Sequence, residues 1–152
     1  MTQPIVRPLT REDHAGWLEL WAGYNAFYGR EGATALPAHI VEATWARLFE
    51  PGEPVRGLVA ELDGELVGLA HYIFQRSTIL IAPTCYMQDL FTSPAARGQG
   101  IGRRLIEAVY ESARAAGSAS VYWHTHAGNG TARRLYDQVA TDTGFVVYRH
   151  IL

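Results

Sequence analysis

Three glycines alternate with other residues in the stretch Arg97-Gly98-Gln99-Gly100-Ile101-Gly102-Arg103, which has a cationic side chain at each end. The stretch follows an apolar, β-prone run at Tyr86–Thr92 that the turn signal Ser93-Pro94 ends, so it comes after a predicted strand. Apolar residues then recur at helical spacing, which predicts a helix beginning near Ile101. Glycines without a Cβ and unpaired N–H groups at a helix N-terminus together form a backbone anion site. The spacing therefore predicts a site for a pyrophosphate.

The pattern Arg97-x-x-Gly100-x-Gly102 separates this loop from other phosphate-binding loops. It is not a Walker A sequence, because no Gly-Lys-Ser/Thr follows, and it is not the dinucleotide G-x-G-x-x-G, because position 103 is arginine. These differences disfavour a P-loop or nucleotide-binding protein. The pattern instead resembles the acetyl-coenzyme A loop of the GNAT N-acetyltransferases. On these six residues alone, an ordinary glycine-rich turn is the alternative.

A second motif follows further along the chain. It comprises Trp123-His124-Thr125-His126, then Asn129, Ala132 and Tyr136, and finally Gly144-Phe145. This order resembles the segment that follows the coenzyme loop in GNAT proteins. With the preceding hairpin, the resemblance covers residues 56–151. Within the family, the sequence most resembles the small yeast histone-acetyltransferase subgroup and the spermidine/spermine acetyltransferases. The resemblance implies an α/β (α+β) fold, a single GNAT domain over residues 1–152, with a mixed central sheet of about six or seven strands flanked by about four helices.

Local signals place the other elements. Asp63-Gly64 between two apolar runs predicts a tight hairpin turn, and Thr10 is the expected cap of the first helix. By the crossover rule, the strand at 120–125 lies parallel to the one at 86–92. The expected strands cover residues 5–9, 56–62, 65–74, 86–92, 120–125 and 145–151, with a strand-like stretch at 78–81, and the expected helices cover 10–28, 38–49, 101–116 and 131–140.

The resemblance implies that acetyl-CoA is the co-substrate. Backbone N–H groups around Leu90 and Phe91 then stabilise the oxyanion at the thioester carbonyl, on a strand that splays away from its neighbour to free its backbone for the pantetheine arm. Asn129 is expected to bond the pantetheine amide or to cap a helix. The expected coenzyme-binding residues are Leu90, Phe91, Thr92, Arg97, Gly98, Gln99, Gly100, Ile101, Gly102, Arg103 and Asn129.

Tyr136 is the expected acid for the leaving thiolate. A thiol has a pKa of about 8.5 and a tyrosine of about 10, so a phenol can return a proton to the departing sulfur. The resemblance implies this role from the position of Tyr136 in the second motif. Periodicity alone would make it a member of an apolar helical stripe, since it lies one turn after Ala132.

Gln88-Asp89 departs from the family pattern. Close relatives typically have Glu-Asp there, and the glutamate is the usual candidate for the general base. Gln88 cannot take a proton, so Asp89, another group or a water chain must do so. Asp89 is therefore a candidate catalytic residue, with a strand-end carboxylate bonded to backbone, or a charge that attracts a cation, as alternatives. The missing glutamate also keeps open a non-catalytic coenzyme A-binding sensor or regulatory domain.

The acceptor is expected to be a primary amine that attacks directly in a ternary complex. Tyr24 and Tyr28, at the end of the first helix, can hold a cation over their rings, or they pack in the core. With Gln88 and His124 they form the expected substrate site, where His124 is a proton relay or a half-buried polar side chain. A polyamine, an amino acid, an antibiotic and the lysine of a basic peptide all fit.

Length and composition bound the remaining possibilities. A chain of 152 residues predicts one domain, and its net charge of −2 argues against a general nucleic-acid binder. The sequence has neither a membrane-length apolar run nor a signal-peptide pattern at its start. Cys85 is the one cysteine and cannot form an internal disulfide, so we expect a cytoplasmic protein. His124 and His126 lack a third ligand, so no metal is expected. A homodimer is one alternative for the oligomeric state.

Overall fold

A computed structural model describes residues 2–152 as a mixed α/β fold on one five-stranded sheet. The strand order is β1-β2-β3-β4-β5, and every pair is antiparallel except β4 and β5. The strands are β1 (Ile5–Pro8), β2 (Val55–Leu62), β3 (Glu65–Gln75), β4 (Thr84–Thr92) and β5 (Val121–Tyr122). The helices are α1 (His14–Phe27), α2 (Ala38–Phe49), α3 (Ile101–Ala115) and α4 (Gly130–Val139). Three short 3-10 helices lie before α1, between α1 and α2, and between β4 and α3: η1 (Arg11–Asp13), η2 (Gly32–Thr34) and η3 (Pro94–Ala96). No helix within residues 2–152 combines the length and the apolar character that crossing a bilayer demands.

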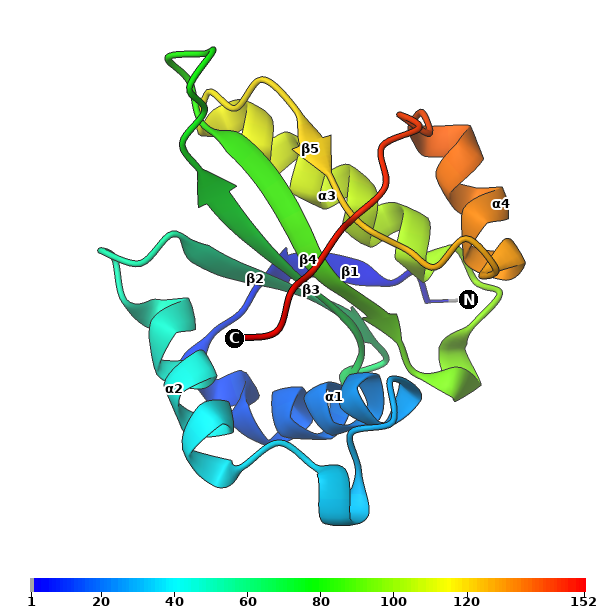
Figure 1. The fold of residues 1–152 in the computed structure, drawn as a ribbon. Coiled ribbons are helices and arrows are strands. Elements are labelled where there is room, and N and C mark those ends of the chain that lie inside the picture. The colour runs from blue at the N-terminus through cyan, green and yellow to red at the C-terminus, as the bar shows by residue number, and fades with distance from the viewer. Residues whose placement is uncertain (1) are drawn as a thin grey trace.

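Helices cover both faces of the sheet (Figure 1). On one face, Ile101 and Leu105 of α3 pack with Leu58 and other strand residues. On the opposite face, Trp17 of α1 packs with Val59. Neighbouring residues Leu58 and Val59 serve different faces because side chains alternate along a strand. Each face therefore has its own apolar core.

The hairpin between β2 and β3 turns at Asp63-Gly64, as predicted. Asp63 has φ of 52° and Gly64 has φ of 81°. Two consecutive positive φ angles are those of a type I′ turn, whose twist matches that of the flanking strands.

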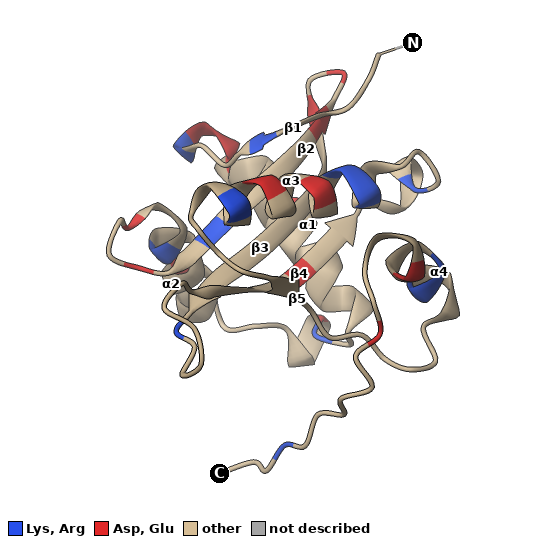
Figure 2. Ribbon diagram, turned by 90° about the horizontal axis from the view of Figure 1, so that it is seen from above, with Lys and Arg blue, Asp and Glu red and all other residues tan. Residues whose placement is uncertain are grey.

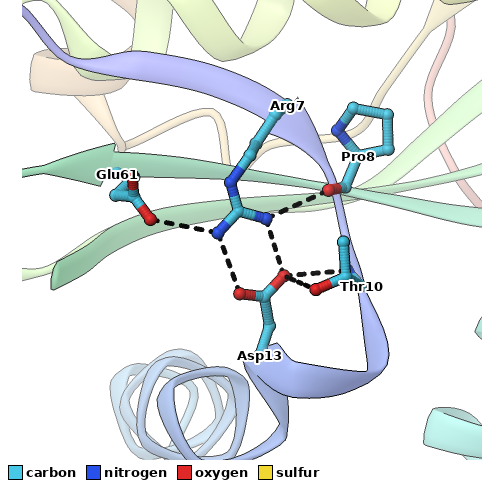
Figure 3. A network of polar contacts seen from close by, with 5 residues as sticks. All are labelled: Arg7, Pro8, Thr10, Asp13 and Glu61. Atoms are coloured by element: carbon cyan, nitrogen blue, oxygen red, sulfur yellow. Dashed lines mark hydrogen bonds and ion pairs between the residues drawn. The ribbon is translucent and has the colours of Figure 1, made fainter. Parts of the chain in front are cut away.

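A polar network ties the start of the chain to the sheet (Figure 3). Arg7 on β1 donates two hydrogen bonds to Asp13, at 2.7 and 2.9 Å, and one to Glu61 on β2 at 3.1 Å. The Thr10 N–H donates to Asp13 Oδ2 at 2.8 Å, which closes the turn that leads into α1. Hydrogen bonding from Arg7 lowers the pKa of Asp13, so the carboxylate stays charged over a wider pH range.

A β-bulge in β4 changes which face its side chains reach. Tyr72 pairs with Met87, but the preceding residue of β3, His71, pairs with Asp89, so Gln88 is an extra residue in β4. Met87 lies in the core under α3, whereas Asp89 contacts His71 on the α1 face. An inserted residue has this effect because it shifts the two-residue side-chain period.

β4 and β5 separate soon after they meet. They pair only at Cys85–Val121 and Tyr86–Tyr122, so the later part of β4 has no strand on that side within residues 2–152. The splay that the family resemblance implied is therefore present. β5 is shorter than the expected strand at 120–125, because its last residues turn away from β4.

The sheet has five strands, fewer than the six or seven predicted, whereas the four expected helices are present. The predicted last strand, 145–151, is irregular and exposed. It pairs with no strand of the sheet within residues 2–152, and Figure 2 shows it extending away from the body of the molecule, so no neighbouring strand completes its hydrogen bonds. The strand-like stretch at 78–81 is a loop, with Ile79 and Ile81 exposed.

Candidate active site

A small cleft lies where β4 and β5 separate. Its walls come from the end of α1, the bulge of β4, the segment after β5, and α4. The lining residues are Tyr24, Tyr28, Met87, Gln88, Leu90, Trp123, His124, Thr125 and Tyr136. Folding thus brings all four predicted substrate residues together with the predicted acid Tyr136.

Tyr136 stands in the α4 wall of the cleft. It packs edge-to-face on Trp123, with the ring centroids 5.3 Å apart. Burial raises the pKa of Tyr136 above its usual value, so the phenol is protonated at neutral pH. A protonated hydroxyl at the cleft wall can donate to an anionic ligand atom.

Asp89 lies behind the cleft wall. Its Oδ2 is 2.9 Å from His71 Nδ1, and the residue is 6% exposed. Tyr24, which lines the cleft, is close enough to Asp89 to feel its charge. Burial raises the pKa of the Tyr24 hydroxyl, and the nearby charge of Asp89 raises it further.

His71 is a site residue that was not predicted from the sequence. Nothing local marks a histidine inside an apolar strand, because its partner Asp89 lies 18 residues later in the chain. A buried polar residue needs such a partner, so a histidine in a predicted core strand is itself a signal worth pursuing.

The glycine loop has the backbone that an anion site requires. Gly98 and Gly100 have φ of 79° and 77°, in the left-handed region that other residues rarely adopt. Gly100 is the N-cap of α3, and no side chain caps this helix start. Gly102 lies within the first turn of α3 in ordinary helical geometry. The N–H groups of that turn are therefore open to a ligand.

The loop arginines differ in their contacts. Arg97 Nε donates to the Thr92 carbonyl oxygen at 3.2 Å, and its guanidinium lies 5.8 Å from the centroid of the Phe91 ring. Arg103 is instead hydrogen-bonded to Gln138 of α4. Arg97 thus stays beside the loop, whereas Arg103 links the loop helix to the helix that carries Tyr136.

The other predicted coenzyme residues have structural contacts of their own. Asn129 caps α4, since its side chain accepts a hydrogen bond from the Ala132 N–H at 3.4 Å. Ile101, the first residue of α3, is buried in the core between α3 and the sheet. Gln99 and Phe91 line a larger, open depression between α1, the β2–β3 turn and η3. We place the site at the smaller cleft, because the phenols and the freed backbone of β4 are there.

Arg30 occupies the place that was expected for a substrate cation. Its guanidinium carbon lies 5.9 Å from the Tyr24 ring centroid and 5.6 Å from that of Tyr28. Its Nε donates to Oδ1 of the buried Asn25 at 2.7 Å, which holds the side chain in place. The cation over the Tyr24 and Tyr28 rings is therefore the guanidinium of Arg30, where a substrate cation was expected.

Comparison with known proteins agrees with this geometry. The model of the acetyltransferase (GNAT) family matches residues 16–140. The chain is 33% identical over 147 residues to the D-amino-acid N-acetyltransferase HPA3 of Saccharomyces cerevisiae, covering 95% of this chain and 89% of the relative. It is 32% identical over 145 residues to the uncharacterized N-acetyltransferase YhfO of Bacillus subtilis, covering 94% of each.

A solved structure has the same fold. AAC(6')-Iy, in complex with the bisubstrate analog CoA-S-monomethyl-acetylneamine, superposes with a TM-score of 0.84 over 99% of each chain, at 16% identity. At that identity the likeness concerns the fold.

Proposed function

This chain belongs to the acetyltransferase (GNAT) family and uses acetyl-CoA, and we propose that it transfers the acetyl group to a primary amine by direct attack in a ternary complex. The observation that supports this most is the meeting of Tyr136, Tyr24 and the unpaired stretch of β4 in one cleft. We treat residues 1–152 as one catalytic domain, a proposal supported by the single sheet that joins β1 to β5. The buried free thiol of Cys85 supports a cytoplasmic location.

In the proposed complex the coenzyme diphosphate lies on the loop from Arg97 to Arg103. The left-handed glycines and the uncapped first turn of α3 support this placement. The pantetheine arm follows β4 along Leu90, Phe91 and Thr92, where no strand competes for the backbone. Asn129 then serves both as the cap of α4 and as a polar group near the arm.

The chemistry requires a neutral amine. An amine with a pKa of about 10.4 is neutral in roughly 1 of 2,500 molecules at pH 7. Its nitrogen attacks the thioester carbon, and the N–C bond forms as the C–S bond breaks. Backbone N–H groups near Leu90 and Phe91 stabilise the oxyanion, and Tyr136 protonates the sulfur. The amine proton passes to the Tyr24 oxygen while the Tyr24 proton passes to Asp89, which takes the part that Gln88 cannot.

The acceptor is proposed to be a small amine that carries a carboxylate. Arg30 supports this choice, because a guanidinium fixed over Tyr24 and Tyr28 attracts an anion and repels a second cation. An amino acid meets both requirements, and the name of the yeast relative, a D-amino-acid N-acetyltransferase, agrees with it. A polyamine or the lysine of a basic peptide would lack the anion.

A homodimer is also proposed, formed through the segment 144–152. Phe145, Val147 and Tyr148 are among its exposed apolar residues, and Figure 2 shows the segment extending away from the body of the molecule. β5 is the last strand of the sheet within residues 2–152, so its outer edge can accept a strand from a second copy.

Tyr136→Phe tests the catalytic reading. We expect turnover, measured as thiol release with a panel of amino acids and amines, to fall about 100-fold or more, because a general acid contributes roughly 10²–10⁴-fold. Calorimetry should show acetyl-CoA binding little changed. Tyr110→Phe is the control, since that hydroxyl bonds the Val139 carbonyl oxygen outside the cleft. Coenzyme binding without any thiol release by the wild type would favour the sensor alternative.

A further inference from the structure

A polar cluster lies buried between α1, β3 and β4, directly behind the cleft. Trp17 Nε1 donates to His71 Nε2 at 3.0 Å, and His71 Nδ1 lies 2.9 Å from Asp89 Oδ2. Trp17 is 0%, His71 2% and Asp89 6% exposed. Leaving a buried polar group without a hydrogen-bond partner costs free energy, so the arrangement of these three side chains is tightly constrained.

The chemistry of these groups fixes the direction of each hydrogen bond. An indole N–H can only donate, so Nε2 must be the unprotonated nitrogen of His71. The imidazole proton is then on Nδ1, which donates to the Asp89 carboxylate. A second proton, on Nε2, would set two N–H groups against each other, so this geometry fits the tautomer of His71 that carries its proton on Nδ1 alone.

The same direction continues to the cleft through Tyr24. An ionised carboxylate only accepts hydrogen bonds, so a hydrogen bond between Asp89 and the Tyr24 hydroxyl must run from the hydroxyl to the carboxylate. Tyr24 lines the cleft, which leaves the lone pairs of its oxygen for a ligand. A ligand that meets this oxygen must itself donate, as an amine N–H does.

We propose that Trp17 and His71 are positioning residues for acetyl transfer, which hold Asp89 as an acceptor-only carboxylate and so make the Tyr24 oxygen an acceptor for the substrate N–H. This inference rests on the proposed function. Neither residue lines the cleft, and both act through Asp89 and Tyr24.

The direction of these hydrogen bonds can be tested without an activity assay. Proton–nitrogen correlation spectra of the ¹⁵N-labelled full chain distinguish the two neutral tautomers of histidine from the imidazolium. The His71 signal is assigned by its loss in His71→Gln. We expect His71 at pH 7 to be neutral with its proton on Nδ1. A proton on Nε2 overturns the proposal.

Two matched substitutions test the consequence for catalysis. Trp17→Phe removes the N–H that bonds His71. Trp21→Phe removes an indole on the same helix that packs edge-on to His71 at 4.9 Å but whose Nε1 has no partner within residues 2–152. We expect kcat of Trp17→Phe to be about tenfold below that of Trp21→Phe, with an unchanged KM for acetyl-CoA. Only Trp17→Phe should let His71 Nε2 take a proton.

The outcomes separate the two proposals. Equal kcat in the two tryptophan variants, with His71 changed only in Trp17→Phe, rejects the positioning role. If the wild type acetylates no amine although His71 has the expected tautomer, the proposed function fails, while the inferred direction of the hydrogen bonds from Trp17 to Asp89 stands.

Discussion

Arg30 holds a positive charge over the rings of Tyr24 and Tyr28, two residues that line the cleft. Replacing Arg30 with Gln should raise KM about tenfold or more for an amino acid, because a charge-assisted hydrogen bond to the carboxylate is lost. The amine of the same side chain without the carboxylate should lose nothing, and its KM should fall if repulsion by Arg30 matters. The ratio of kcat/KM for the two substrates is the measurement.

Arg114→Gln is the matched control for Arg30→Gln. Arg114 lies exposed on α3, where it pairs with Glu111 one turn earlier, so its removal should leave the ratio unchanged. If Arg30→Gln shifts both substrates alike, Arg30 shapes the cleft and does not recognise a carboxylate.

Individual residues of the site differ in how well the sequence predicts them. Tyr136 could be placed because a motif surrounds it, and it lines the cleft as expected. Arg30 and His71 could not be predicted, because their roles depend on partners from other elements. Asn25 orients Arg30, and Trp17 and Asp89 contact the two ring nitrogens of His71. Such side chains acquire a role only when the fold brings their partners within hydrogen-bonding distance.

At the start of α3, the backbone conformation requires one glycine, whereas the proposed ligand alone requires another. A Cβ added at Gly102 would lie 3.5 Å from Leu135 Cδ2, an ordinary contact, and alanine favours a helix by about 1 kcal/mol over glycine. Gly102→Ala should therefore unfold at an unchanged or higher temperature. A bulky side chain at the same position should weaken binding: Gly102→Leu should bind acetyl-CoA at least tenfold more weakly, because the side chain obstructs the diphosphate at the first turn.

Gly100→Ala gives the contrasting case. At φ of 77° an alanine costs roughly 1–2 kcal/mol, so this variant should lose stability as well as affinity. Thermal unfolding and calorimetry together separate the two effects. Wild-type affinity for acetyl-CoA in Gly102→Leu would contradict the placement of the diphosphate at the N-terminus of α3.

The network around Arg7 predicts an acid-dependent stability. The folded pKa of Asp13 is lowered below its ordinary value of 3.8, so the ionised carboxylate stabilises the fold above that pH, and this stabilisation is lost as the pH falls below it. Asp13→Asn should lower Tm by a few degrees at pH 7, with the difference shrinking below pH 3.8. Asp142→Asn, at an exposed pair with Arg133, should show no such trend. A constant difference across this range would contradict the role of Asp13.

Elements with a local signal could be predicted, and irregularities in them could not. Asp63-Gly64 specifies its turn by backbone preference, so the hairpin was placed correctly. The bulge at Gln88 has no such signature, because it is defined by the register of β3 against β4. It nevertheless decides the site, since it places Gln88 at the cleft and turns Asp89 toward His71 on the α1 face.

At the scale of the whole molecule, the end of the chain is the feature that a single copy leaves unexplained. Residues 145–151 have the composition of a strand, which is why one was predicted there. Phe145 is 91% and Tyr148 93% exposed, an arrangement that costs hydrophobic free energy unless something covers these side chains. A sequence pattern can identify a strand but cannot say which chain supplies its neighbour.

We therefore expect the protein to be a dimer at micromolar concentration and a shortened chain that ends at Thr143 to be a monomer, as measured by sedimentation equilibrium. Reciprocal addition of the segment beside β5 would satisfy the backbone of both strands and bury Phe145 and Tyr148 against the partner. Phe145→Asp in the full chain should weaken the dimer without removing any backbone, which separates lost length from lost apolar contact. Arg149→Gln keeps the apolar side chains and should remain dimeric. A wild type that sediments as a monomer at tens of micromolar, or a dimer that survives loss of the segment, would place the association elsewhere.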